Sequence, residues 1–215
     1  MKTDKINAVL LAGGESSRFG SDKALLSFAG MKLIEYIFYK LDQNFNKVII
    51  VGSKDKYSFL KKAEIREDIY QNRGPLAGIY TGLYFSDTDY NFITGCDIPF
   101  LSSQYFDFLK KEAAAKPEAE IIVPQFKGYL EPLAAIYKRS LLPEIKKQIL
   151  NDNLKIKSFY QKSRKIIIKE EILKRNFRLE KLFFNLNYPE DRKKAINYLK
   201  EEADSIAKNK RENIY

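Results

Sequence analysis

The sequence contains no histidine and no tryptophan, and it has a single cysteine, Cys96. Without histidine the chain can form neither a Ser-His or Cys-His nucleophile pair nor a histidine metal site. Imidazole also cannot carry protons here. Any chemistry must therefore use carboxylates, lysine, arginine, tyrosine, hydroxyls, backbone groups or a bound metal. A single cysteine excludes a disulfide within the chain, and a lone thiol is typical of a reducing compartment.

Long hydrophobic runs are also missing. The N-terminal stretch MKTDKINAVLLAGG has too short an apolar run for a signal peptide, and no later run approaches the length of a membrane span. We therefore expect a cytoplasmic protein that has no membrane partner.

Positive charge is in excess and is unevenly distributed. The 215 residues include 38 Lys+Arg and 28 Asp+Glu, a net charge of +10. Residues 151–215 hold 17 basic and 10 acidic residues, or +7, which leaves +3 for residues 1–150. A basic C-terminal third could attract nucleic acid or an anionic partner. Its basic residues are interspersed with acids, however, which is typical of solvated helices, so nucleic acid is not the expected partner.

Short apolar runs alternate with segments of helical periodicity along the chain. Strands are expected at 6–11, 47–51, 90–94, 121–123, 133–137 and 166–168. Helices are expected at 31–41, 56–63, 75–85, 102–115, 139–150, 154–160 and from Pro189 onward. This alternation predicts an α/β fold: a single-domain three-layer sandwich with a mostly parallel sheet and helices on both faces. One domain of residues 1–205 is expected, and residues 206–215 are expected to fray.

The first motif is LAGGESSRFGSDKALLSF, which follows the first predicted strand. Gly13 and Gly14 let backbone amides approach an anion closely, because no Cβ stands in the way. Arg18 offers a planar fork of donors suited to phosphate, and Lys23 adds a compact positive charge. The stretch has neither the Gly-Lys-Ser/Thr ending of a P-loop nor the GxGxxG spacing. It predicts either an anion site or a charged surface loop.

Two further stretches fall at the carboxyl ends of predicted strands, where ligands bind in open α/β sheets. Gly52 and Ser53 follow the second strand, and Asp97 follows the third. The Asp97 carboxylate could hold Mg²⁺ or could cap a turn before Pro99. Cys96 is expected to be a buried neighbour, because the chain has no histidine to activate its thiol.

The segment NRGPLAG places two glycines around a proline at a predicted helix start. It could bring backbone close to a flat ligand, or it could be a plain junction between loop and helix. Asp68, six residues before Gly74, could accept hydrogen bonds from a base or ribose, or it could be solvated. The segment NLNYPED precedes the last helix, where Asn187 could end an extended stretch.

Together, LAGGESSRFGSDKALL, GPLAGIYTGL, ITGCDIPFLS and NLNYPED resemble the molybdenum cofactor guanylyltransferases in both order and spacing. This family belongs to the nucleotidyltransferases of glycosyltransferase-A-like fold. The resemblance spans roughly residues 6–200. Many sugar and alcohol nucleotidyltransferases share the first motif, whereas the combination with the other three is much narrower. The resemblance implies a Rossmann-like nucleotide-binding half at about 1–100 and an acceptor-binding half at about 101–205.

The resemblance also implies an activity. The protein would transfer GMP from GTP to the terminal phosphate of molybdopterin, release pyrophosphate and form the guanine dinucleotide cofactor. Mg²⁺ is the implied cofactor. The protein is expected to be a monomer that docks transiently with proteins supplying or receiving the cofactor.

Specific residues take roles under this resemblance. Arg18 and Lys23 would hold the phosphates, Asp97 would bind Mg²⁺, and Asn187 would belong to the pterin side. The residues implied to contact GTP are Leu11, Ala12, Gly13, Gly14, Lys23, Ser53, Asp68, Gly74, Pro75, Leu76, Gly78 and Asp97.

Two departures leave alternatives open. The family often has an asparagine after the second strand that helps to recognise guanine, and here Gly52 and Ser53 follow it. Glu67 also competes with Asp68 for the nucleoside contact. The alternatives are a molybdopterin cytidylyltransferase and a nucleotidyltransferase acting on a sugar phosphate or a methylerythritol-type alcohol phosphate. A hypothesis of another class is a basic module with a degenerate nucleotide site that binds nucleic acid or an acidic protein.

Overall fold

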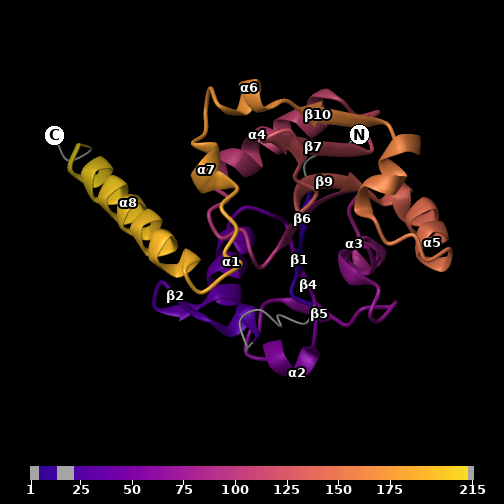
Figure 1. The fold of residues 1–215 in the computed structure, drawn as a ribbon, viewed down its shortest axis with the longest axis horizontal. Helices are drawn as coiled ribbons and strands as arrows, with labels where there is room; N and C mark the ends of the chain where they lie inside the picture. Colours follow the sequence, from indigo (N-terminus) through magenta and orange to yellow (C-terminus); the bar gives the residue numbers. More distant parts are fainter. Residues whose placement is uncertain (1–4, 14–21, 213–215) are drawn as a thin grey trace.

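The structure is a computed structural model that describes residues 5–13 and 22–212, with side chains described as far as residue 202. Within these ranges the chain forms an eight-stranded sheet and a separate two-stranded hairpin, with helices packed around the sheet (Figure 1). The mixed, mostly parallel sheet confirms the predicted α/β class.

Seven strands of the large sheet lie in the order β10-β7-β9-β6-β1-β4-β5, and β8 pairs with β7. These strands are β1 (Asn7–Leu11), β4 (Val48–Val51), β5 (Glu64–Arg66), β6 (Tyr90–Gly95), β7 (Ile121–Phe126), β8 (Tyr129–Leu130), β9 (Ala134–Lys138) and β10 (Lys165–Ile168). β1 is parallel to both β4 and β6, whereas β9 is antiparallel to β6 and β7. Leu11 is in register with both Val51 and Gly95, so three strands end at one level.

The sheet is covered on both faces. The covering helices are α1 (Leu33–Asp42), α3 (Gly74–Phe85), α4 (Ser103–Ala115) and α5 (Leu142–Leu150). Side chains alternate along β1: Ala8 and Leu10 pack in the core with α1 and α4, whereas Val9 and Leu11 pack in the core with α3 and α5. This alternation is the period of two that a strand imposes, and it produces the predicted three-layer sandwich.

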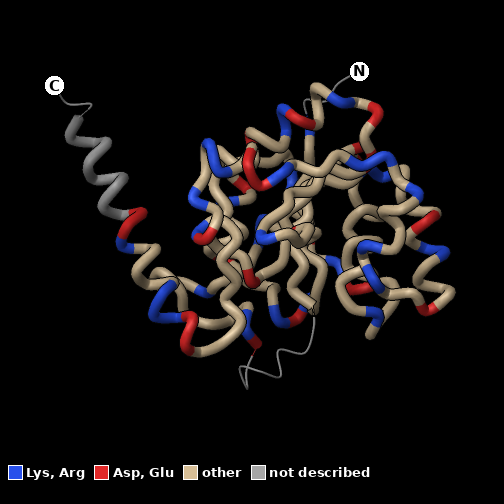
Figure 2. The backbone as a smooth tube through the Cα atoms, turned by 45° about the horizontal axis from the view of Figure 1, so that its top comes forward, with Lys and Arg blue, Asp and Glu red and all other residues tan. Residues whose placement is uncertain are grey.

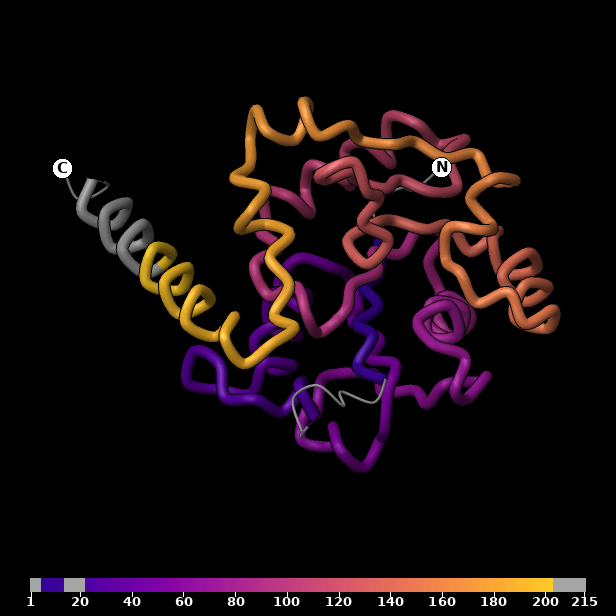
Figure 3. Tube along the Cα trace, in the orientation of Figure 1, coloured from indigo at the N-terminus to yellow at the C-terminus, as the bar shows by residue number. Residues whose placement is uncertain are grey.

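Short elements connect these layers. They are η1 (Lys23–Leu25), β2 (Ser27–Phe28), β3 (Met31–Lys32), α2 (Lys54–Tyr57), η2 (Arg139–Leu141), η3 (Ile156–Lys162), α6 (Glu170–Leu173) and α7 (Leu179–Leu182). The last described helix is the long α8 (Asp191–Glu212). The start of α8 lies beside the β2–β3 hairpin (Figure 3), and α8 points away from the sheet (Figure 1). Basic and acidic residues alternate over much of the described chain (Figure 2).

Glycines seat α3 directly on β1. A Cβ at Gly78 would lie 3.0 Å from Leu11 Cδ2, and one at Gly82 would lie 2.3 Å from Val9 Cγ1. Because Gly78 faces the end of β1 and Gly82 faces its middle, α3 runs opposite to the strand. The N-terminus of α3, at Gly74 and Pro75, therefore lies at the carboxyl end of the sheet.

We expect Gly82→Ala to lower the free energy of unfolding by about 1–3 kcal/mol, as overpacked cores do. The new Cβ would collide with a β-branched side chain on a buried strand, which outweighs the gain of up to about 1 kcal/mol from replacing glycine within a helix. Urea denaturation measures the change. Gly78→Ala is the matched control, because the end of a leucine side chain can move aside, so its loss should be smaller. Equal stability of Gly82→Ala and wild type would contradict the close packing.

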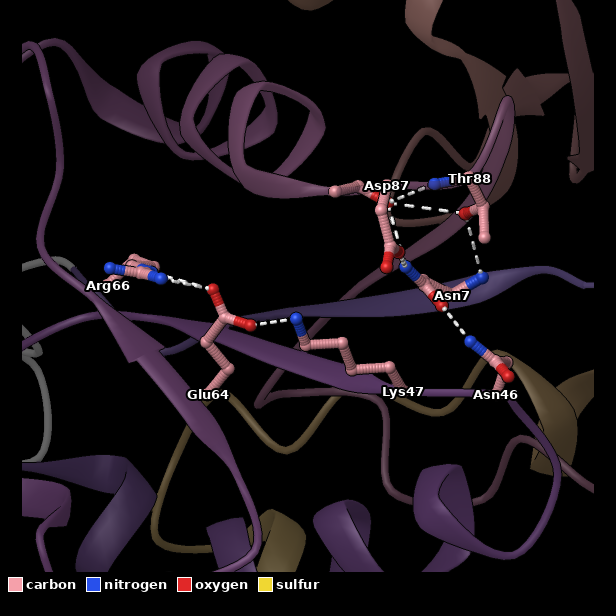
Figure 4. A network of polar contacts seen from close by, with 8 residues as sticks. Asn7, Asn46, Lys47, Glu64, Arg66, Asp87 and Thr88 are labelled. Carbon is pink, nitrogen blue, oxygen red and sulfur yellow. Dashed lines mark hydrogen bonds and ion pairs between the residues drawn. The ribbon is translucent and has the colours of Figure 1, made fainter.

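Polar groups at the amino end of the sheet satisfy one another (Figure 4). The Asn7 side-chain amide donates to Ser86 Oγ at 2.9 Å and to Asp87 Oδ1 at 2.7 Å. The Asn46 side-chain amide donates to Asn7 Oδ1 at 3.0 Å, and the Asn7 backbone N–H donates to Thr88 Oγ1 at 3.2 Å. This network ties β1 to the loop before β4 and to the end of α3, which is a structural role.

One predicted helix is wrong. The expected helix at 56–63 is limited to α2, which ends at Tyr57, and the sheet gains the edge strand β5 at Glu64–Arg66. Ile65 pairs with Ile50 in a parallel ladder. A three-residue strand between charged residues has too short a pattern to show in the sequence, so tertiary pairing decides it.

Candidate functional site

The loops after β1, β4 and β6 lie side by side at the carboxyl end of the sheet. The Ala12 N–H donates to the Val51 carbonyl at 2.8 Å, and the Cys96 N–H donates to the Leu11 carbonyl at 3.3 Å. Parallel strands that end at the same level bring their loops to one edge, which is where open α/β sheets bind ligands.

Two adjoining cavities open there. The first, here called the Asp68 cavity, has a volume of about 340 Å³ and is lined by Gly13, Val51, Asp68, Gln71, Asn72, Gly74, Pro75 and Gly78. The second, here called the Asp97 cavity, has a volume of about 230 Å³ and is lined by Leu11, Ala12, Gly13, Asp22, Lys23, Ala24, Pro75, Gly95, Cys96, Asp97 and Leu133. Gly13 and Pro75 line both cavities, so one extended ligand can reach from one into the other.

Asp68 supplies the acid of the first cavity. Its Oδ1 accepts a hydrogen bond from Thr81 Oγ1 at 3.3 Å, and Thr81 Oγ1 accepts one from the Ile69 N–H at 3.1 Å. Burial raises the pKa of Asp68, and the Thr81 hydrogen bond opposes this by a smaller amount. The adjacent Glu67 is exposed, whereas Asp68 is half-buried and lines the cavity. The geometry thus favours Asp68 for contact with a ligand.

Asp97 supplies the acid of the second cavity. Its Oδ1 is buried and has no hydrogen-bond partner among the residues that the structure describes. A Cβ at Gly95 would lie 2.6 Å from this oxygen, so glycine is needed there for the carboxylate to take this position. The Asp97 carbonyl accepts the Leu186 N–H at 2.8 Å, which ties the turn after β6 to the segment before α8.

Lys23 and Asn187 meet beside Asp97, although they are 164 residues apart in sequence. The Lys23 ammonium donates to Asn187 Oδ1 at 2.9 Å. Asp191 holds the backbone of the asparagine segment, because its Oδ2 accepts the N–H groups of Asn187 and Tyr188, each at 2.8 Å. A cation from the first motif and an amide from the last motif therefore lie in one place.

The donor set fits Mg²⁺. This ion prefers oxygen ligands, usually takes one or two carboxylates and keeps several waters or substrate phosphates. The buried, unpaired Oδ1 of Asp97 is the kind of atom that such an ion would satisfy. Within residues 5–13 and 22–212, no three or more His, Cys, Asp or Glu side chains cluster so that protein alone could hold a metal ion. Phosphate oxygens and water would have to complete the shell.

The surroundings favour anion binding over nucleophilic chemistry. The N-terminus of the twelve-residue helix α3 lies at both cavities through Pro75, and its dipole favours negative charge there. Burial, with the charges of Asp97 and Asp22, raises the pKa of the Cys96 thiol. The thiol therefore stays protonated and is not a nucleophile, as the sequence predicts.

Comparison with known proteins identifies the family. The model of the MobA-like NTP transferase domain matches residues 8–166. The chain belongs to this family. The match runs from β1 to the middle of β10, so it includes all the residues that line both cavities.

Relatives extend the match beyond this MobA-like domain. A Carboxydothermus hydrogenoformans protein named "Probable molybdenum cofactor guanylyltransferase" is 35% identical over 191 residues, which cover 89% of this chain and 95% of that protein. A Natranaerobius thermophilus protein of the same name is 33% identical over 201 residues, covering 92% of this chain and 98% of that protein. The crystal structure of molybdopterin-guanine dinucleotide biosynthesis protein A from Archaeoglobus fulgidus is 26% identical with a TM-score of 0.79, covering 91% of this chain and all of that one.

Most of the site residues predicted from the sequence line the two cavities of the MobA-like domain. Those in the Asp68 cavity are Gly13, Asp68, Gly74, Pro75 and Gly78. Those in the Asp97 cavity are Leu11, Ala12, Gly13, Lys23, Pro75 and Asp97. Asn187 joins the second group through its contact with Lys23.

Two predicted site residues, Leu76 and Ser53, line neither cavity. The Leu76 side chain is fully buried in the core, so its backbone alone can face a ligand. Ser53 caps α2, its hydroxyl accepting the Lys56 N–H at 3.4 Å. Gly14 and Arg18 fall outside the described residues.

The sequence reasoning missed Asp22, Gly95 and Leu133, which also line the Asp97 cavity. Asp22 and Gly95 each stand next to, or within two residues of, a nominated residue. Their closeness in sequence to predicted site residues is the only feature of the sequence that points to them, because their contacts depend on the fold. No helix of the MobA-like domain within the described residues is both long and apolar enough to cross a bilayer.

Proposed function

We propose that this protein transfers GMP from GTP to the terminal phosphate of molybdopterin, releasing pyrophosphate and forming the guanine dinucleotide cofactor. The observation that carries the proposal is that Asp97 and Lys23 line one cavity, which adjoins the Asp68 cavity, and that Lys23 also contacts Asn187. The names of the full-length relatives support this reaction in particular.

The two cavities suggest where each substrate binds. The nucleoside would occupy the Asp68 cavity, with Asp68 accepting hydrogen bonds from the base or ribose. The phosphates would cross Gly13, which has no Cβ to obstruct them, and would meet Lys23. Molybdopterin would approach from the Asn187 side, so its phosphate would reach the nucleotide next to Lys23.

Asp97 would hold Mg²⁺ through the oxygen that is unpaired within the described residues. When bound, the ion supplies charge stabilisation to the phosphates during transfer. Gly95 is also required, because a Cβ at this position would lie 2.6 Å from the Asp97 oxygen.

The reaction needs little covalent chemistry from the protein. An oxygen of the molybdopterin phosphate attacks the α-phosphorus of GTP, a new P–O bond forms, and the bond to the β-phosphate breaks as pyrophosphate takes the electron pair. The attacking phosphate is already mostly ionised near pH 7, so no general base is required, in keeping with a chain without histidine. The barrier is the repulsion between two anions, which Lys23 and the loop amides offset. Holding both substrates in line can remove up to about 7–11 kcal/mol of entropic cost.

A panel of nucleotides tests the substrate. With Mg²⁺ present, we expect GTP to raise the melting temperature, and CTP, ATP and UTP to leave it unchanged. At a concentration of a hundred times Kd, GTP should add about 2.7 kcal/mol to the free energy of unfolding. Pyrophosphate release from GTP that depends on added molybdopterin would establish the acceptor. A shift with CTP in place of GTP would support the cytosine form and contradict guanine transfer.

A further inference from the structure

Asp22 is an acid in a cavity proposed to bind phosphates, where its charge would repel the ligand. Its two oxygens are engaged in different directions. Oδ1 accepts the Ala24 N–H at 3.1 Å and so caps η1, the short helix that carries Lys23. Oδ2 accepts the Lys56 ammonium at 3.1 Å and the Tyr57 hydroxyl at 3.2 Å.

Tyr57 reaches the other side of the same cavity. Its hydroxyl lies 2.8 Å from the Ala12 carbonyl oxygen, which follows the end of β1. A phenol has a single proton to donate, so the proton is shared between the Ala12 carbonyl and Asp22, and the shorter distance favours Ala12. Ala12 precedes Gly13, and Asp22 precedes Lys23. The Tyr57 hydroxyl on α2 therefore makes hydrogen-bond contacts to the residue before Gly13 and to the residue before Lys23.

The surroundings of Tyr57 fix its position. Only 1% of its surface is exposed, and a Cβ at Gly52 would lie 2.8 Å from its Cε2 atom. Glycine after β4 therefore makes room for this ring. Burial, with the charge of Asp22, raises the pKa of the Tyr57 phenol, so the hydroxyl is a donor at neutral pH.

We propose that Asp22 and Tyr57 are positioning residues for the nucleotide: together they set Gly13 and Lys23 at the spacing that the phosphates of GTP require. This inference rests on the proposed function. Lys56 and Tyr57 hold the Asp22 carboxylate toward α2, so its charge is compensated on the side away from the ligand. This role also explains why Gly52 and Ser53 follow β4 where the family often has an asparagine: Gly52 leaves room for the Tyr57 ring, which contacts Asp22.

The first test is Tyr57→Phe, which keeps the buried ring and removes the hydroxyl. We expect the Kd and KM for GTP with Mg²⁺ to rise about tenfold, the size of effect that loss of one hydrogen bond to a charged group produces. The KM for molybdopterin and kcat should stay near wild type, because the lost interaction acts on nucleotide binding in ground state and transition state alike. Tyr90→Phe is the matched control: its buried hydroxyl contacts the carbonyls of Pro117 and Ala119, away from both cavities. It should leave the GTP affinity unchanged.

The second test is Asp22→Asn, alone and combined with Tyr57→Phe. Asparagine retains an acceptor for the Ala24 N–H, but it removes the negative charge and presents an amide donor to the Lys56 ammonium, which can only donate. The GTP Kd should again rise about tenfold. The double variant should lose less than the product of the two single losses, because the contact between Asp22 and Tyr57 is common to both.

Each outcome decides the inference. Wild-type GTP affinity in Asp22→Asn, or a double variant whose loss is the product of the two single losses, would overturn it. If Tyr57→Phe does not fold, Asp22→Asn carries the test by itself. If the wild-type protein binds GTP and the variants bind it equally well, the positioning role is overturned and the proposed function is not. A wild-type protein that binds no GTP overturns the proposed function and this inference together.

Discussion

Asp97→Asn is expected to lower kcat for pyrophosphate release by about a hundredfold or more, comparable with the loss of one group that stabilises a transition state. Asparagine has almost the same shape as aspartate but lacks the negative charge that holds Mg²⁺. The oxygen Oδ1 is buried with no hydrogen-bond partner in the described part of the chain, so the substitution breaks no hydrogen bond to this oxygen. We therefore expect the melting temperature of the free protein to be equal to or above that of wild type.

This pairing of lost activity with retained stability distinguishes a metal-binding acid from a structural one. Asp107→Asn is the control, because Asp107 is an exposed acid on α4 whose side chain is 62% accessible. It should leave kcat unchanged. The stabilisation by GTP with Mg²⁺ should also fall in Asp97→Asn. Wild-type turnover in this variant would contradict the role of Asp97.

Lys23→Met should lower kcat/KM for GTP by about a hundredfold or more for a second, independent reason. Methionine keeps most of the length of the lysine side chain and removes its ammonium group, which would lie between the two anionic substrates. The Asn187 side-chain oxygen would also lose a donor at 2.9 Å, so the KM for molybdopterin should rise in the same variant.

Steady-state kinetics with each substrate varied in turn measures both effects. Lys111→Met, at an exposed position on α4, provides a control that changes the net charge equally. If Lys111→Met weakened turnover as much as Lys23→Met, the effect would come from the overall charge of the protein, and the assignment of Lys23 would be wrong.

Local patterns in the sequence predicted much of the site because its chemistry is concentrated in short motifs. The apolar run ending at Leu11, the Gly13 that follows it and Asp97 after the third strand all lie where strand ends place them. The helix that begins near Pro75 was expected within one residue of α3. Each of these features depends on residues close together in the chain. Over such short distances the hydrophobic period sets the type of secondary structure, and glycine or proline sets where it ends or begins.

Side-chain partnerships across the fold could not be predicted in this way. Nothing local distinguishes Asp68 from the exposed Glu67, or shows that Tyr57 meets Asp22. The edge strand β5 is not among the predicted strands, because three residues carry too little pattern.

The sequence by itself determined the α/β class, the layers and the stretches that carry the chemistry, because the alternation of apolar residues and the breaks at glycine are local properties. The tertiary structure alone decided that Lys23 touches Asn187, that Asp97 keeps an oxygen unpaired within the described residues, and that Gly95 leaves space for it. The contact of Lys23 with Asn187 joins segments 164 residues apart, so no short window of sequence contains both partners. The surroundings of the Asp97 oxygen depend on the conformation of the turn after β6 and on the segments that pack around it, which the residue types in that turn do not specify by themselves.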